Sequence, residues 1–203
     1  KFVDFNKDLT KGETKKGLPV LYVKNTENGR FMLNYYYKFG ETSNKWLPYA
    51  TEYFNYLGTD KMTAEQLKQK FYELACSYSI NVGSRTLQVS ISGLAENMTE
   101  AMTLMEDFIA NAKVDKEAYD KYVGIVEKSR ADNKLDQRVN FNRLQQYGMY
   151  GPYNGARNMP SSTELKEMDP QKLVDMIKDL KNYKHAVAVI HDHAGLCPVR
   201  LAQ

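Results

Sequence analysis

The sequence predicts an α+β fold in which helices cover one face of an antiparallel sheet. Pairs of alternating segments, typical of β-hairpins, are separated from runs of helical periodicity, and the elements follow the order ββ-αα-ββ-αααα-β. With 203 residues, of which 42% are hydrophobic, the chain is long enough to bury one core. We expect a single domain over residues 1–191 and an irregular tail over residues 192–203.

Five segments have the pattern of β-strands. They are residues 18–25, 30–40, 77–83, 85–93 and 185–191. The first two segments flank the turn TENG and predict an antiparallel hairpin. The third and fourth alternate in polarity around Gly83 and Ser84 and predict a second hairpin, and the apolar run HAVAVIH predicts a closing strand.

Capping residues and apolar periodicity predict the helices. Thr63 and Gln66 have the spacing of a capping box, in which each side chain accepts a hydrogen bond from the other residue's backbone N–H. Pro48 suits the first turn of the opening helix, which we expect to end at Gly58. The predicted starts are Pro48, Thr63, Asn97, Asp115, Gln137 and Asp169.

Composition excludes several classes of function. The 28 basic residues are interspersed with 25 acidic ones, so we expect no nucleic-acid partner. The longest apolar run, residues 186–190, is far shorter than a membrane-spanning helix, so we expect no membrane span. Cys76 and Cys197 have neither a disulfide framework nor a zinc-type spacing, which leaves the compartment open. The start at Lys1, without a signal peptide, suggests a fragment or a processed product.

The opening helix carries two distinct faces. An apolar stripe that should pack on the sheet is formed by Leu47, Ala50, Phe54 and Leu57. A second face, pointing away from the first, is formed by Tyr49, Glu52, Tyr53 and Tyr56. Residues three and four apart are neighbours on a helix, and paired histidines use this spacing to hold zinc with a glutamate beside them. Here tyrosines occupy the two ligand positions.

The run LPYATEYFNYLGTDKMTAEQL, residues 47–67, resembles the zinc-site helix of insulinase/pitrilysin-type metallopeptidases, whose inverted motif is H-x-x-E-H followed by Gly-Thr. Aligned on Gly-Thr, the histidines fall on Tyr49 and Tyr53 and the catalytic glutamate on Glu52. The segments KKGLPVLYVKN, NVGSRT and IVEKSRADNKLD also resemble the family, the last being similar to the helix with a distant zinc-ligating glutamate. That glutamate would fall on Glu127 or Lys128.

The resemblance implies a domain whose metal motif is degenerate. Such peptidases are built from homologous halves, one with the zinc motif and one without, which enclose a chamber for unfolded peptide. Tyrosine, with a pKa near 10, is a poor substitute for imidazole. We therefore expect no metal or other cofactor on this chain, no catalytic residue, and zinc on a homologous partner half in the same or another chain. Asn81 lies at the family's Asn-centred hairpin, and with Gly83 and Ser84 it is the expected peptide contact.

Two alternatives stay open. One is a structural or assembly protein of the same fold, similar to the core subunits of respiratory complexes that are related to mitochondrial processing peptidase. The other is an autonomous peptidase with a rearranged site. A metal cluster at His191, Asp192 and His193, with Cys197 following, is set against an ordinary polar strand end, because alternation brings the two histidines to one face only if the strand continues that far.

Overall fold

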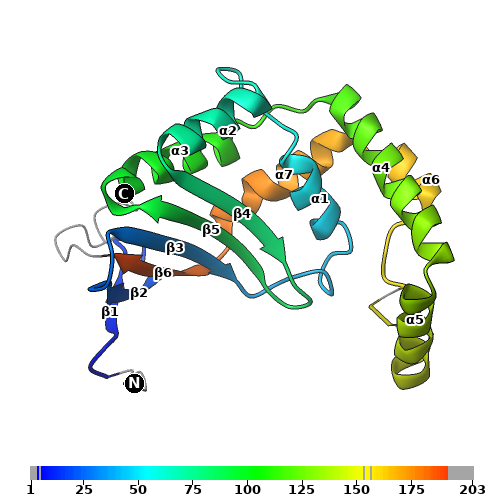
Figure 1. The fold of residues 1–203 in the computed structure, drawn as a ribbon, viewed down its shortest axis with the longest axis horizontal. Helices are drawn as coiled ribbons and strands as arrows, with labels where there is room; N and C mark the ends of the chain where they lie inside the picture. The colour runs from blue at the N-terminus through cyan, green and yellow to red at the C-terminus, as the bar shows by residue number, and fades with distance from the viewer. Residues whose placement is uncertain (1–3, 5, 153, 156, 192–203) are drawn as a thin grey trace.

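A computed structural model describes residues 4, 6–152, 154–155 and 157–191. In these residues a six-stranded sheet is covered on one face by helices, which confirms the predicted fold class (Figure 1). The strands are β1 (Thr10–Glu13), β2 (Pro19–Lys24), β3 (Arg30–Tyr37), β4 (Cys76–Val82), β5 (Leu87–Leu94) and β6 (His185–His191). Their order across the sheet is β1-β2-β6-β3-β5-β4, so β1 and β4 are its edge strands.

The predicted hairpin between residues 18–25 and 30–40 is wrong. The closing strand β6 lies between β2 and β3, parallel to β2 and antiparallel to β3. The turn after β2 is nevertheless compact, because the Asn25 side-chain amide donates to the Arg30 carbonyl oxygen at 2.8 Å. β2 pairs instead with β1, a strand that the sequence did not predict, through a turn in which Gly17 has a φ of 74°. A positive φ of this kind favours glycine.

The second hairpin is confirmed. β4 and β5 pair antiparallel, with Ile80 opposite Val89, and the backbone N–H of Gly83 donates to the Thr86 carbonyl oxygen at 2.8 Å. The odd-numbered residues Leu87, Val89 and Ile91 of β5 are buried under the helices. The even-numbered positions Gln88, Ser90 and Ser92 are polar, which gives the sheet a covered apolar face and an uncovered, more polar one.

The helices are α1 (Leu47–Phe54), α2 (Ala64–Glu73), α3 (Met98–Asn111), α4 (Lys116–Leu135), α5 (Gln137–Tyr150), α6 (Ser162–Glu167) and α7 (Pro170–Lys178), with the 3-10 helices η1 (Ala95–Asn97) and η2 (Asp179–Asn182). The Thr63–Gln66 capping box and the Asp115 cap, which accepts from the Ala118 N–H at 3.0 Å, are confirmed. Asn97 precedes α3 as predicted, but its side chain does not cap the helix. It donates to the Leu74 carbonyl oxygen at 2.8 Å.

The core lies between the sheet and the layer formed by α1, α2, α3 and α7. All four residues of the predicted apolar stripe on α1 are buried, and the rings of Phe54 and Phe108 lie 4.4 Å apart. The helix ends at Phe54, earlier than the predicted Gly58. Gly58 is still required, because a Cβ there would collide with the Met62 carbonyl oxygen.

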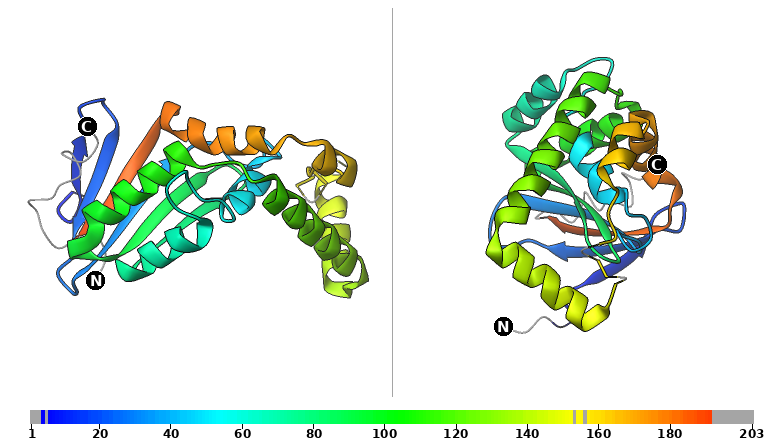
Figure 2. Two further views of the ribbon diagram at one scale, coloured as in Figure 1. Left: turned by 90° about the horizontal axis from the view of Figure 1, so that it is seen from above. Right: turned by 90° about the vertical axis from the view of Figure 1, so that its right-hand side faces the viewer.

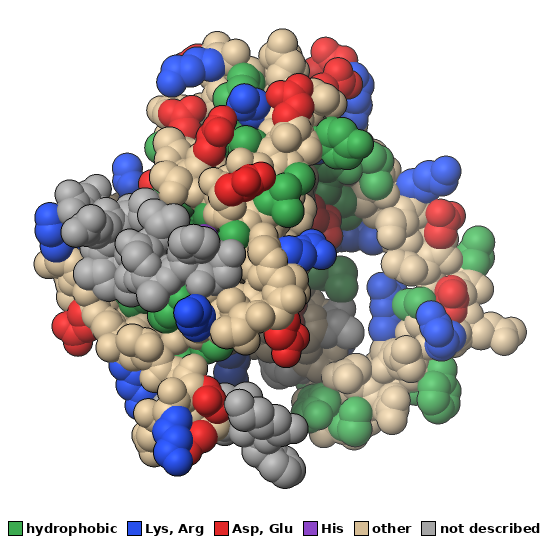
Figure 3. Space-filling view, turned by 60° about the vertical axis from the view of Figure 1, so that its left-hand side comes forward, with side chains coloured by type: hydrophobic (Ala, Val, Ile, Leu, Met, Phe, Trp, Pro, Cys, Tyr) green, Lys and Arg blue, Asp and Glu red, His purple; other side chains and the backbone are tan. Residues whose placement is uncertain are grey.

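α4 and α5 extend away from this body as an arm (Figure 2). None of the residues of α5 is buried, although five of its side chains are large and apolar. They are Phe141, Leu144, Tyr147, Met149 and Tyr150, each at least 50% exposed. Basic and acidic side chains are interspersed over the face of the molecule seen in Figure 3.

Candidate functional site

The motif face of α1 points toward α4. Pro48 lies in the first turn of α1, as predicted, and the apolar stripe fixes the rotation of the helix against the sheet. Tyr49, Glu52 and Tyr53 are therefore turned toward the side chains of α4, and each forms a hydrogen bond with it or with its N-cap residue. We call this set of contacts the α1–α4 joint.

Tyr53 is the buried centre of the joint. Its side chain is 0% exposed, and its hydroxyl both donates to the Asp115 carbonyl oxygen at 2.7 Å and accepts from the Asp115 N–H at 3.0 Å. Its ring meets that of Tyr119 edge-on at 5.1 Å and stacks with that of Tyr122 at 6.2 Å. Asp115 is the N-cap of α4, so Tyr53 fixes the start of α4 against α1.

Glu52 is exposed, but its carboxyl group accepts a hydrogen bond. The Tyr122 hydroxyl donates to Glu52 Oε2 at 2.9 Å. Burial, together with the nearby charge of Glu52, raises the pKa of Tyr122 well above its usual value. The phenol therefore stays protonated at neutral pH and remains a donor to Glu52.

Tyr49 is held by an arginine that the sequence alignment did not single out. Arg130 Nη2 donates to the Tyr49 hydroxyl and to the Pro160 carbonyl oxygen, both at 2.8 Å. The guanidinium carbon also lies 5.8 Å from the centre of the Tyr49 ring, within the range of a cation–π contact. This cation sits beside the first motif position, where a metal ligand is expected in an intact site.

The residues predicted at the distal position lie elsewhere. Glu127 pairs with Lys166 of α6 at 2.9 Å, and Lys128 is exposed. Helical spacing identifies the residue that does reach the motif face: Arg130 follows the partly buried Val126 by four residues and shares its side of α4. The signal was therefore present in the apolar stripe of α4, and the alignment with the family motif missed it.

The donor set of the joint does not fit zinc. A catalytic zinc site uses neutral imidazoles and a carboxylate and keeps one position open for water. Here the first ligand position is a phenol bound to a guanidinium, and the second is a buried phenol whose pKa is raised by burial and whose oxygen already has two partners. The geometry suits a structural connection between α1 and α4.

The predicted peptide-contact residues lie at the hairpin between β4 and β5. The Asn81 side chain is exposed and donates to the Ser79 hydroxyl at 3.0 Å. The carbonyl oxygens of Gly83 and Ser84 accept from the backbone N–H groups of Glu41 and Thr42 at 3.0 and 3.1 Å. The hairpin turn is thus tied to the loop after β3, and β4 is an edge strand of the sheet.

Only one residue of the proposed C-terminal metal cluster belongs to the described part of the chain. His191 is buried at the end of β6, and its Nε2 lies 3.2 Å from the Ala95 carbonyl oxygen. Asp192, His193 and Cys197 lie outside the described residues. Within residues 4, 6–152, 154–155 and 157–191, no three His, Cys, Asp or Glu side chains are grouped so that they suit a metal ion.

Solved structures share this fold over almost the whole chain. A complex of the ferredoxin protease FusC with Arabidopsis ferredoxin has a TM-score of 0.80 over 98% of this chain and 23% of its own, at 16% identity. An inactive domain of an M16 peptidase from Pseudomonas fluorescens has a TM-score of 0.79 over 96% of this chain and 49% of its own, at 13% identity. The chain has the insulinase/pitrilysin (M16) peptidase fold. The periplasmic protease PqqL from Escherichia coli likewise gives a TM-score of 0.78 over 96% of this chain and 22% of its own, at 14% identity.

Sequence comparison gives a different kind of match. No family model matches the chain. ATP synthase subunit b from two strains of Ureaplasma parvum is 31% identical over 141 residues, which are 69% of this chain and 63% of the relative. The domain thus spans less than two thirds of the length of these curated relatives. No described helix is long and apolar enough to cross a membrane.

Proposed function

We propose that this chain is a noncatalytic, zinc-less domain of an insulinase-type metallopeptidase, which forms part of a peptide-binding chamber and pairs with a homologous zinc-bearing half. The observation that carries the proposal is the α1–α4 joint. At the positions of the family motif, Tyr49 and Tyr53 are hydrogen-bonded within the protein, and Arg130 supplies a cation beside them. The peptidase fold is kept while the chemistry of its metal site is replaced by structural contacts.

The absence of catalysis follows from the same contacts. A general base in such a site acts on a water whose pKa a metal has lowered. Glu52 has a tyrosine hydroxyl as its hydrogen-bond partner, and the flanking phenols do not suit zinc. Glu52 therefore has no activated nucleophile to deprotonate.

Peptide binding is supported by the edge strand β4. An exposed edge presents unpaired backbone groups, and an extended peptide can add to it as a further strand, with side-chain pockets giving selectivity. β4 is the last strand in the sheet order, and the exposed Asn81 lies near its end. The backbone of Glu41 and Thr42 holds the hairpin turn at Gly83 and Ser84, so β4 is already ordered before a peptide binds. Preorganisation of this kind lowers the entropic cost of binding.

Pairing with a second half is supported by α5. A 14-residue helix without buried residues is only marginally stable in water, and its exposed aromatic and methionine side chains are types enriched at protein interfaces. In addition, this chain covers only 22–49% of the three M16-type structures described above, so those proteins contain further parts of comparable size.

A reconstitution assay tests the proposal. The purified chain is mixed with a homologous domain that carries an intact H-x-x-E-H motif, encoded in the same gene or a neighbouring one, and cleavage of fluorogenic unfolded peptides is followed. We expect no cleavage by this chain alone and cleavage by the mixture. Cleavage by this chain alone that is lost in Glu52→Gln would overturn the proposal.

Substitutions at two turn glycines separate a role in peptide binding from a role in folding. A Cβ at Gly83 would meet only the Thr86 Oγ1 atom closely, at 3.3 Å, so Gly83→Leu should fold while it crowds the β4 edge. Gly29→Leu is the matched control, because a Cβ there meets no atom within 4 Å. The first variant should lower the restored cleavage and the second should leave it unchanged.

A structural or assembly protein of the same fold is the second candidate. The match to ATP synthase subunit b favours it, because that protein is by name one subunit of a larger assembly. The two candidates differ in one outcome of the reconstitution assay. A zinc-bearing half that is fully active by itself and gains nothing from this chain favours the assembly protein.

A further inference from the structure

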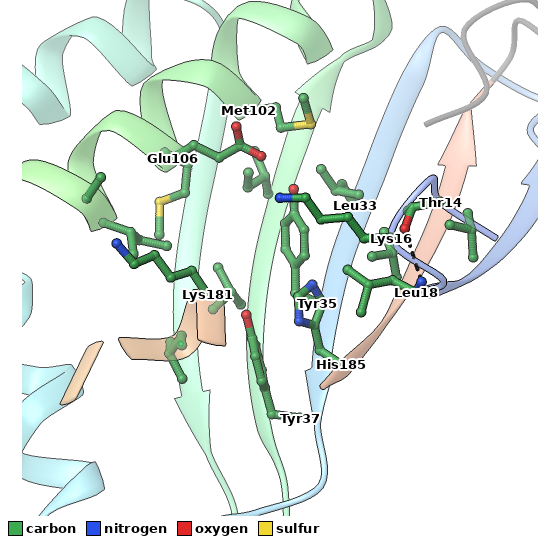
Figure 4. A pocket seen from close by; sticks show the side chains of 18 residues that line it. Thr14, Lys16, Leu18, Leu33, Tyr35, Tyr37, Met102, Glu106, Lys181 and His185 are labelled. Carbon is green, nitrogen blue, oxygen red and sulfur yellow. Dashed lines mark hydrogen bonds between the residues drawn. The ribbon is translucent and has the colours of Figure 1, made fainter. Parts of the chain in front are cut away.

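A pocket lies between the sheet and α3 (Figure 4). In the body of the molecule α3 lies on the side opposite the arm that carries α4 and α5 (Figure 1). Its volume is about 370 Å³, within the range of small-molecule sites. The strands supply apolar walls such as Leu33, Val89 and Val187, and α3 supplies Met102 and Met105. The site is separate from the α1–α4 joint, and none of the contacts described above uses it.

Polar groups gather at the rim of this pocket. Lys16 comes from the β1–β2 turn, Glu106 from α3 and Lys181 from η2, and Figure 4 shows the Lys16 side chain extending across the pocket toward the Glu106 side. The phenol of Tyr35 points to the same region. Among the described residues, none of these four side chains has a hydrogen bond or an ion pair.

The remaining rim residues are held in place by packing. The His185 ring lies 5.8 Å from that of Tyr35 and 4.9 Å from that of Tyr37, and its Nδ1 lies 2.9 Å from the Tyr183 carbonyl oxygen. The β1–β2 turn is closed by the Leu18 N–H, which donates to Thr14 Oγ1 at 3.0 Å. The turn that carries Lys16 is therefore ordered, and the rim is preformed.

We propose that this pocket binds a small amphiphile that consists of an apolar body and one carboxylate. The apolar walls receive the body, and the carboxylate lies at the rim between Lys16 and Lys181, where the Tyr35 hydroxyl is a further donor. Apolar pockets with a few convergent polar groups at one end are the usual form of such sites. The proposal is independent of the proposed peptidase-related function.

The balance of charge selects a single negative charge. Two ammonium groups, those of Lys16 and Lys181, and one carboxyl group, that of Glu106, line the pocket, so its rim has an excess of one positive charge when Glu106 is ionised. Lysines without a fixed fork of donors suit a carboxylate held by simple charge attraction.

Calorimetric titration with decanoate, with decan-1-ol as its uncharged counterpart, tests the proposal. We expect decanoate to bind and decan-1-ol to bind about tenfold more weakly or worse, because it lacks the charge. The double substitution Lys16→Met and Lys181→Met should weaken decanoate binding about tenfold. Lys184→Met is the matched control, since Lys184 is exposed and lies outside the pocket. Equal binding of the two ligands, or no effect of the double substitution, overturns the proposal.

A second variant locates the ligand. Ala110 lines the pocket but is exposed in the last turn of α3, so Ala110→Trp should block the pocket without disturbing the core. Loss of decanoate binding with an unchanged circular dichroism spectrum supports the assignment, and unchanged binding overturns it. An acetylated peptide ending in leucine, compared with its amide, distinguishes the source of the carboxylate. Binding of decanoate alone indicates a free fatty carboxylate, binding of the peptide acid indicates a chain terminus, and binding of neither contradicts the proposal.

Discussion

The substitution Tyr53→Phe removes one buried oxygen from the α1–α4 joint and keeps the ring. The lost hydroxyl is the hydrogen-bond partner of both the N–H and the carbonyl oxygen of Asp115, at 3.0 and 2.7 Å. The Asp115 carbonyl oxygen keeps the Tyr119 N–H as a donor at 3.0 Å, but the part-buried Asp115 N–H loses its partner. A backbone group without a partner costs about 1–3 kcal/mol, so we expect the free energy of unfolding to fall by about 2 kcal/mol. In a domain of this size that change lowers the melting temperature by about 4–8 °C.

Tyr56→Phe is the matched control for this prediction. Tyr56 follows the end of α1 by two residues, and its ring lies 6.0 Å from that of Tyr122. It is 44% exposed, and its hydroxyl has no hydrogen bond among the described residues. The control should change the free energy of unfolding by less than about 0.5 kcal/mol, as is usual for surface substitutions. Urea unfolding followed by circular dichroism measures both variants. Equal effects of the two substitutions would show that the Tyr53 hydroxyl does not hold the joint together.

Three further predictions concern stability. The pKa of Glu164 is lowered from 4.5 to about 2, mainly by its hydrogen bond from Lys45. Its contribution to the free energy of unfolding is therefore present above pH 4.5 and is lost as the pH falls toward 2. Glu164→Gln should reduce this loss of stability in acid, as measured by urea unfolding. Burial raises the pKa of Tyr119 from 10.0 to about 12, so stability should fall as the pH rises from 10 to 12, and less steeply in Tyr119→Phe. A Cβ at Gly40 would collide with the Gly83 carbonyl oxygen, so Gly40→Ala should cost about 1–3 kcal/mol, whereas Gly83→Ala should cost much less by the same assay.

The fold was largely predictable where the signal is local. The capping box at Thr63 and the aspartate cap at Asp115 depend on residues a few positions apart, and both lie where the sequence placed them. Pairing of the first strands was not predictable in this way. A polar turn after β2 looks like a hairpin turn, but β6, more than 150 residues later, provides an apolar strand that enters between β2 and β3.

The candidate site shows the same division. The grouping of Tyr49, Glu52 and Tyr53 on one face follows from helical spacing and was available from the sequence. Their partners come from α4, and the relative rotation of two helices is set by tertiary packing. Arg130 was for that reason missed, while Glu127 turned out to pair with Lys166. Tyr56, which helical spacing placed on the same face, is 44% exposed, because the joint is centred on Tyr53.

Zinc content is the measurement that tests the central claim most directly. The claim is that Tyr49, Glu52 and Tyr53 form a structural joint in place of a metal site. Elemental analysis of protein purified without chelator and dialysed against zinc should find well under one zinc per chain, in the wild type and in Glu52→Gln alike. One equivalent of zinc that disappears in Glu52→Gln would contradict the account.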